Sequence, residues 1–244
     1  MKIGVKIHPD NKEYIQQIKP HVDFFEIIAI QGKSYGFLNR INIPLVIHAE
    51  DFKYKTNLAN PANNDISAVY LRFAFDLLKE HKAEHLVLNP GVRFNNKCTS
   101  DNHAKIFHKF GYKKVLIENQ PPLKNRTYPF YARNYDEMRQ FLKKTKAGFC
   151  LDLDHAYASA FFFNRDPVDF IKDMLDLKPK HIHISNGRSQ SYIDAHLHFA
   201  EGDFNMLQMK ELIPNDVWVT IDTNSDLNEQ LEEIKFLREP EYSK

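Results

Sequence analysis

Short apolar runs that end in a histidine, aspartate or glutamate recur along this chain, and this repetition constrains the fold more than any other feature. Five runs end in this way, at His48, Glu118, Asp152, His183 and Asp222. A short apolar run predicts a buried strand, and the polar residue then lies at the carboxyl end of that strand. Repeated endings of this kind predict parallel strands that deliver their polar side chains to one site.

Strand-like and helix-like segments alternate along the whole chain. Strands are expected near residues 2–7, 23–28, 44–48, 85–88, 114–118, 147–152, 181–185 and 217–222. Helical patterns lie between them, at 65–81, 100–110, 134–145, 166–177, 204–212 and 225–237. Eight such βα units predict a single α/β domain over residues 1–244, a (β/α)8 TIM barrel. An open doubly wound sheet is the alternative, although no glycine-rich nucleotide-binding motif supports it.

The composition is ordinary and argues against several classes of protein. Of 244 residues, 43% are hydrophobic and 27% charged, which suffices for a well-buried core. A net charge of +1 argues against broad electrostatic attraction to nucleic acid. Cys98 and Cys150 lie far apart, so a disulfide scaffold or thiolate zinc cluster is not expected. Because no apolar segment resembles a signal peptide or a membrane span, we expect a cytoplasmic protein.

Metal-binding side chains accumulate at the predicted strand ends and in the segments that follow them. The ends converge at one mouth of a barrel, so we expect one site there, with these ligands: His48, Glu118, Asp152, His155, His183, Asp194, His196 and Asp222. Imidazole and carboxylate ligands without cysteine suit a catalytic site for zinc, manganese or iron, of which we expect zinc. The set is large enough for two or three ions. Alternatively, Asp152 or Asp154 caps the helix that follows.

These residues resemble the endonuclease IV (AP endonuclease) family within the xylose-isomerase-like barrels. The segment Cys150-Leu151-Asp152-Leu153-Asp154-His155-Ala156 is similar to the family's sixth-strand pattern. Four further segments resemble the family in the same order: His48-Ala49 with Asn57-Leu58, Leu88-Asn89-Pro90-Gly91, Ile117-Glu118-Asn119, and Asp194-Ala195-His196 with Glu201-Gly202. The resemblance covers nearly the whole chain.

The resemblance implies roles for individual residues. Glu118 would be the catalytic residue that bridges two ions, and His48 would belong to the first ion. The remaining ligands would divide into two sets, Asp152, His183 and Asp222 for the second ion and His155, Asp194 and His196 for a third. Asn89 and Arg188 are the expected substrate contacts. The implied activity is hydrolysis of DNA at abasic sites by a metal-activated water.

The sequence also departs from that family. Asn89 stands where the family has a metal-binding histidine, Asp222 replaces a glutamate, and Gln120-Pro121-Pro122 replaces a small, glycine-containing loop. Asn89, the short chain and the near-zero net charge favour an alternative, a metal-dependent sugar or sugar-phosphate isomerase or epimerase of the same superfamily. A third alternative is a barrel without catalytic activity.

Several other features have two interpretations. Lys124, Arg126, Arg133 and Arg188 follow predicted strands, and they either contact phosphate or form a solvated rim. Phe161-Phe162-Phe163 either packs in the core or forms a partner surface, or else it is an apolar wedge that enters a DNA stack. We expect His198 at the surface. The other histidines are expected to be structural or solvated: His8, His21, His81, His85, His103, His108 and His181.

Overall fold

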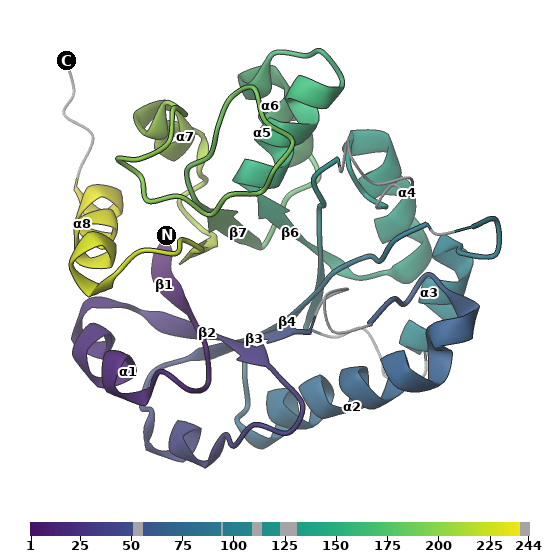
Figure 1. Cartoon of the computed structure of the whole chain (residues 1–244), viewed down its shortest axis with the longest axis horizontal. Helices are drawn as coiled ribbons and strands as arrows, with labels where there is room; N and C mark the ends of the chain where they lie inside the picture. Colours follow the sequence, from purple (N-terminus) through teal and green to yellow (C-terminus); the bar gives the residue numbers. More distant parts are fainter. Residues whose placement is uncertain (51–55, 94, 109–113, 123–130, 240–244) are drawn as a thin grey trace.

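Eight parallel strands pair in the order of the sequence, and β8 pairs with β1, so the sheet closes into a barrel. The computed structural model describes residues 1–50, 56–93, 95–108, 114–122 and 131–239. Within these ranges the helices lie around the outside of the strands (Figure 1). The closed barrel confirms the predicted fold class and removes the open sheet as an alternative.

The strands lie where the apolar runs predict them. Their bounds are β1 Lys2–Ile7, β2 Phe24–Ala29, β3 Leu45–Ala49, β4 His85–Leu88, β5 Val115–Glu118, β6 Gly148–Asp152, β7 His181–Ile184 and β8 Trp218–Ile221. Each bound differs from the predicted range by no more than about one residue, within the usual uncertainty of strand ends. Glu118 pairs with Cys150 and Asp152 pairs with His183, so neighbouring strands end at similar levels.

The α-helices within the described ranges are α1 Lys12–Ile18, α2 Asn64–Glu80, α3 Ser100–His108, α4 Tyr135–Thr145, α5 Leu153–Phe162, α6 Pro167–Leu175, α7 Met206–Leu212 and α8 Leu227–Arg238. The sequence predicts all except α1, which is short, and α5, which is buried on most sides and lacks a broad polar face. Residues 109 and 110 of one predicted helix lie outside the described residues. None of the described helices combines the length and apolar character needed to cross a membrane.

Alternate side chains of the strands divide between the barrel interior and the layer beneath the helices. The interior cluster is separate from the main core and consists of Phe24, Val46, Val87, Leu116 and Cys150, with Trp218 against it. A step of two residues along each strand therefore leads from this apolar floor to another inward position. Glu26, His48, Glu118 and Asp152 occupy such positions. The barrel thus has an apolar floor and a polar mouth.

Buried histidines also occur away from the mouth. His103 of α3 is fully buried, and its ring lies 4.6 Å from that of Phe141 in α4. Burial removes the imidazolium from water and lowers the pKa of His103 to about 3. His181 is also fully buried, and its Nε2 lies 2.7 Å from Thr220 Oγ1. Of the two interpretations, structural or solvated, burial therefore removes the solvated one for both histidines.

Adding a methyl group at Gly4 should destabilise the barrel interior. A Cβ at this position would lie 2.6 Å from the ring of Phe24, which is fully buried and packs 4.7 Å from the Trp218 ring. Gly4→Ala should therefore lower the free energy of unfolding by about 1–3 kcal/mol in urea titrations. Gly36→Ala is the control, because its Cβ would have no neighbour within 4 Å. Equal stability of the two variants would contradict the predicted clash.

His103 should make the fold sensitive to acid. Its pKa is 6.5 in the ordinary state and about 3 in the folded protein, so the unfolded chain binds more protons below pH 6.5. The contribution to stability is unchanged above that pH and is lost as the pH falls from 6.5 toward 3. Between about pH 7 and about pH 5, His103→Leu should lose about 2 kcal/mol less stability than the wild type. The exposed His21→Leu variant should match the wild type, and an equal loss in all three proteins would refute this assignment.

Candidate metal centre

Five side chains from the carboxyl ends of the strands meet at the mouth of the barrel. They are His48 of β3, Glu118 of β5, Asp152 of β6, His183 of β7 and Asp222, which follows β8, and all are buried. Donor atoms of Asp152, His183 and Asp222 lie within 4.8 Å of one another, as do those of Glu118, Asp152 and His155. The structure therefore brings together the residues that end the five apolar runs.

His183 lies between two carboxylates. Its Nδ1 is 2.7 Å from Glu118 Oε1 and its Nε2 is 3.0 Å from Glu26 Oε2. Because carboxylates accept hydrogen bonds, both ring nitrogens of His183 donate in this arrangement. Burial raises the pKa of Glu26, but the charge of His183 and hydrogen bonds from His181 and His183 outweigh it and hold that pKa well below its usual value. Glu26 thus orients His183 with Nδ1 toward the mouth, as a carboxylate does behind a histidine ligand.

Lys6 of β1 is a candidate functional residue that the sequence prediction missed. Its Nζ lies 2.5 Å from Asp222 Oδ2 and 3.9 Å from Glu26 Oε1. Burial lowers the pKa of the ammonium, but Asp222 and Glu26 outweigh it and raise that pKa above its usual value. Strand periodicity could have indicated that Lys6 points into the barrel, because Lys6 and Gly4 lie on the same face of β1. Glu26, a charge within an apolar run, carries a similar signal.

Asp152 caps a helix and faces the donor cluster at the same time. Its Oδ1 accepts a hydrogen bond from His155 N at 2.8 Å, which makes it the N-cap of α5. Its Oδ2 lies 3.7 Å from His155 Nδ1 and 3.8 Å from His183 Nδ1. Burial raises the pKa of Asp152 to about 6. The capping interpretation is therefore confirmed for Asp152, and it leaves the second oxygen directed at the cluster.

A second group of donors surrounds Asp194. Its Oδ2 lies 3.1 Å from His155 Nε2 and 2.8 Å from His196 Nε2. His196 Nδ1 is in turn 2.7 Å from the carbonyl oxygen of Asp222. Burial lowers the pKa of His196, but Asp222 and Asp194 outweigh it and raise that pKa to about 10. The three residues assigned by resemblance to a third ion thus meet beside the first group.

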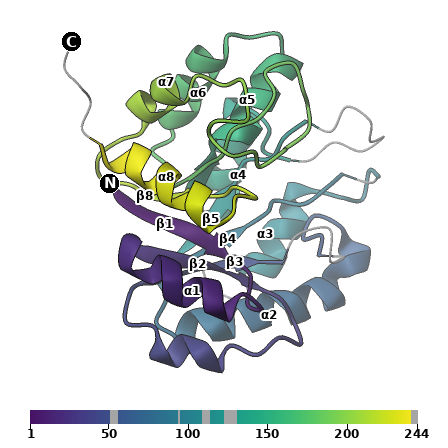
Figure 2. The same cartoon turned by 60° about the vertical axis from the view of Figure 1, so that its left-hand side comes forward.

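The loop of residues 185–205, between β7 and α7, carries Asp194 and is fixed by Asn186. Asn186 forms an isolated antiparallel bridge with Leu197, and its Oδ1 accepts a hydrogen bond from Phe204 N at 3.0 Å. The loop lies beside α5 (Figure 1, Figure 2). This anchoring holds the Asp194 segment against the start of α5.

Asp154 lies behind the Asp194 segment rather than at the helix cap. Its Oδ2 accepts from Ala195 N at 3.3 Å and lies 3.5 Å from Ser185 Oγ. Burial, together with the charges of Asp194 and Asp152, raises the pKa of Asp154 to about 8. At neutral pH Asp154 is therefore mainly protonated, which avoids a further buried negative charge.

Asn89 and Gln120 border Glu118 on the other side of the mouth. Gln120 Nε2 lies 3.2 Å from Glu118 Oε2 and 2.7 Å from Asn89 Oδ1. Burial raises the pKa of Glu118, but the hydrogen bond and charge of His183, with a further contribution from the nearby His48 ring, hold that pKa well below its usual value. Asn89 therefore lies at the mouth, while its contact with a substrate stays a prediction. Gln120 is a neighbour that the sequence did not assign to the site.

The donor set fits a divalent transition metal. Among the described residues, His48 Nε2 and Asp194 Oδ1 are buried without a hydrogen-bond partner. His48 Nδ1 lies 2.9 Å from Ala49 O, and since a carbonyl only accepts, Nδ1 carries the hydrogen. In the neutral ring the lone pair is then on Nε2, which faces Glu118 Oε2 at 3.7 Å. Free imidazole and carboxylate lone pairs of this kind are ligands for zinc, manganese and iron.

Some predicted contacts lie outside this cluster. Arg188 is exposed on the loop after β7. Arg133 forms an ion pair with Glu137 at 2.6 Å. Lys124 and Arg126 lie outside the described residues, so the phosphate-contact and solvated-rim interpretations both remain open for them.

The expectation that His198 lies at the surface is wrong. His198 is 8% exposed, and its Nδ1 lies 2.8 Å from Glu233 Oε1 of α8. The aromatic run at the end of α5 divides: Phe161 and Phe162 are 36% and 40% exposed, whereas Phe163 packs against the core. The core interpretation therefore holds for Phe163 and not for its two neighbours.

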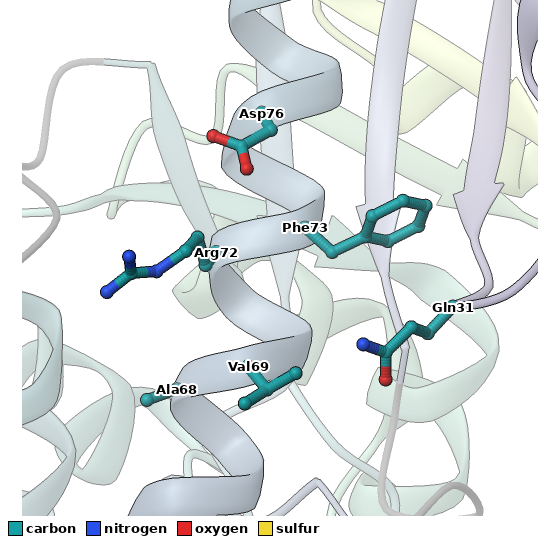
Figure 3. Close-up of a pocket in the computed structure, with 6 residues that line it drawn as sticks. All are labelled: Gln31, Ala68, Val69, Arg72, Phe73 and Asp76. Carbon is teal, nitrogen blue, oxygen red and sulfur yellow. The ribbon is translucent and has the colours of Figure 1, made fainter.

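A hollow of about 450 Å³ on α2 is separate from the metal centre. Figure 3 shows its lining side chains: Gln31, Ala68, Val69, Arg72, Phe73 and Asp76. Arg72 and Phe73 point to different sides of the helix, and Asp76 lies further along it. Because these polar groups do not converge, we assign no chemistry to this hollow.

Comparison with known proteins identifies the fold. No family model matches the chain, and no curated protein matches its sequence. Endonuclease IV from Thermus thermophilus is 18% identical, with 98% of each chain covered and a TM-score of 0.76. A D-tagatose 3-epimerase-like protein is 20% identical, with 97% of this chain and 98% of that chain covered and a TM-score of 0.73. The 3-keto-D-glucoside 4-epimerase from E. coli is 14% identical, with 98% of this chain and 99% of that chain covered and a TM-score of 0.63. This chain therefore shares the TIM-barrel fold of a nuclease and of epimerases.

Replacing Glu118 should abolish most metal binding. Glu118→Gln removes the charge that faces both His48 and His183, and a neutral amide is a weaker ligand than a carboxylate. Elemental analysis after incubation with zinc and gel filtration should show loss of most metal, whereas the exposed Glu84→Gln variant should retain the wild-type content. A folded Glu118→Gln protein with undiminished metal content would contradict the proposed centre.

Proposed function

We propose that this protein is a metal-dependent phosphodiesterase of the endonuclease IV type that hydrolyses DNA at abasic sites. The observation that carries the proposal is the second donor group, in which Asp194 lies between His155 and His196. Phosphodiester hydrolysis benefits from adjacent ions, because one can act on the attacking oxygen and another on the leaving oxygen. The two groups are close enough for this, since His155 Nδ1 lies 3.7 Å from Asp152 Oδ2.

The chain's own residues suit a reaction at a negatively charged phosphate. Bound divalent ions would supply Lewis-acid stabilisation and lower the pKa of a water. Glu118 is ionised and buried at the mouth, where it can accept a hydrogen bond from that water. Lys6 places a permanent positive charge beside Asp222, and a desolvated ammonium stabilises charge on phosphate oxygens more strongly than an exposed one does.

An aromatic surface at the end of α5 and on the Asp194 loop supports a nucleic acid substrate. Phe161 and Phe162 are partly exposed, and their rings lie 4.9 and 5.9 Å from that of Tyr192 on the Asp194 loop. Arg133 lies 6.0 Å from the centre of the Phe162 ring. Aromatic rings of this kind can stack against a base that an abasic site leaves without its partner.

The alternative is a sugar isomerase or epimerase, and one observation favours it. The amide of Gln120 contacts Glu118 and Asn89 on one side of the mouth. The residues around His183 then form one complete ligand set, which is sufficient for a single ion that binds sugar oxygens during proton transfer. This alternative leaves the Asp194 group without a metal function.

A duplex with one abasic analogue tests the proposal. The zinc-loaded protein should nick this strand and leave an intact duplex uncut, and chelation should stop the reaction. Asp194→Asn should remove about one metal per chain and slow nicking by at least about 100-fold, because a charge-stabilising group is lost from the site. Asp216→Asn, at an exposed position before β8, is the matched control.

The result also separates the two enzyme classes. Absence of nicking by fully metal-loaded protein across neutral to mildly alkaline pH would overturn the nuclease proposal. Ketose–aldose exchange or epimerisation in a panel of sugars and sugar phosphates, with one metal per wild-type chain, would support the alternative.

A further inference from the structure

The resemblance implies three positions for metal ions at the mouth. The position between His48, Glu118 and Asn89 differs from the other two. The resemblance to endonuclease IV implies a first ion here, held by His48, Glu118 and a histidine at position 89. His48 Nε2 faces Glu118 Oε2 at 3.7 Å, as this arrangement requires. The third ligand is instead Asn89, and its Oδ1 lies 2.7 Å from Gln120 Nε2.

The orientation of the Gln120 amide follows from its neighbours. Glu118 Oε2, at 3.2 Å, only accepts hydrogen bonds, so the Gln120 atom that faces it is the nitrogen. The Asn89 atom that faces the same nitrogen must then be the oxygen. The Gln120 nitrogen also lies 3.2 Å from Asn119 O. Both hydrogens of the Gln120 amide therefore have acceptors, and Gln120 is only 4% exposed.

We propose that the Gln120 side-chain amide takes the place of the first ion, so that this chain binds two metal ions rather than three. The amide gives hydrogen bonds to the oxygens of Glu118 and Asn89 to which an ion would bind. An ion here would take these two acceptors and leave the buried NH₂ group with Asn119 O, so that one of its two hydrogens would be unpaired, which is costly. The ion would gain only one imidazole, one carboxylate and a neutral amide oxygen in exchange.

The two remaining positions do not depend on this contact. One is formed by Asp152, His183 and Asp222 with Glu118 Oε1, and the other by His155, Asp194 and His196. The inference rests on the proposed metal centre, but it does not depend on the substrate. His48 Nε2, which is buried without a hydrogen-bond partner, is then left for a hydrogen-bonding group of the substrate.

Metal stoichiometry of the full chain tests the inference. Zinc bound per chain is measured by elemental analysis after equilibrium dialysis against buffered free zinc. We expect two equivalents for the wild type and two for Asn89→His, because Gln120 still occupies the position. The double variant Asn89→His/Gln120→Ala should bind three, and Asn89→His/Gln31→Ala, with an exposed control glutamine, should bind two.

The opposite results would overturn the inference. Three equivalents in the wild type would mean that Gln120 does not occupy the position, and three in Asn89→His alone would mean that only residue 89 excludes the ion. Two equivalents in a folded double variant would also overturn the inference, because the first-ion position would then exclude metal even without the Gln120 amide.

A crystallographic measurement avoids reliance on the variants. Wild-type crystals grown with zinc should give two anomalous peaks per chain, with the Gln120 amide within hydrogen-bond distance of Glu118. A third peak beside His48 would refute the inference. Nicking is scored separately: two ions without nicking reject the proposed function alone, whereas three ions with nicking reject this inference alone.

Discussion

The hydrogen bonds from His183 to Glu118 and Glu26 are the contacts on which the metal centre depends. They join β7 to β5 and to β2, so they cross the interior of the barrel. Both carboxylates are buried and ionised, and such charges are tolerated only with close partners. His183 neutralises part of this charge, and Lys6 neutralises another part beside Asp222. The polar mouth is therefore one electrostatic unit above an apolar floor, rather than a set of independent ligands.

Strand positions and the identity of the main donors followed from local sequence. A run of apolar residues defines a strand, and its last side chain faces the mouth, so Glu118 and Asp152 were accessible to prediction. Their partners were not. Lys6 meets Asp222 across 216 positions of sequence, and Glu26 meets His183 across 157. Strand periodicity indicates which face a side chain occupies, but it does not indicate which side chain lies opposite it.

The missed features outside the mouth have similar causes. Helix α5 is buried on most sides, so the contrast between apolar and polar faces that identifies a helix is weak there. His198 stands in a polar loop whose composition suggests solvation, yet Glu233 of α8 approaches it in the fold. Gln120 follows a strand end but offers neither a charge nor an imidazole. Its importance becomes visible only once the distances to Glu118 and Asn89 are known.

Protons and metal ions compete for the same donor atoms at the mouth, so the fold alone does not determine the chemistry there. Burial opposes the charge on His155, but Asp152 and Asp194 outweigh it and raise the pKa of His155 well above its ordinary value. Protons therefore occupy nitrogen atoms that a metal ion would use as ligands. A divalent ion must displace these protons, so metal affinity is coupled to pH. The same barrel can then serve a nuclease or an epimerase, according to which donors exchange protons for metal and which, like Gln120, keep their hydrogens.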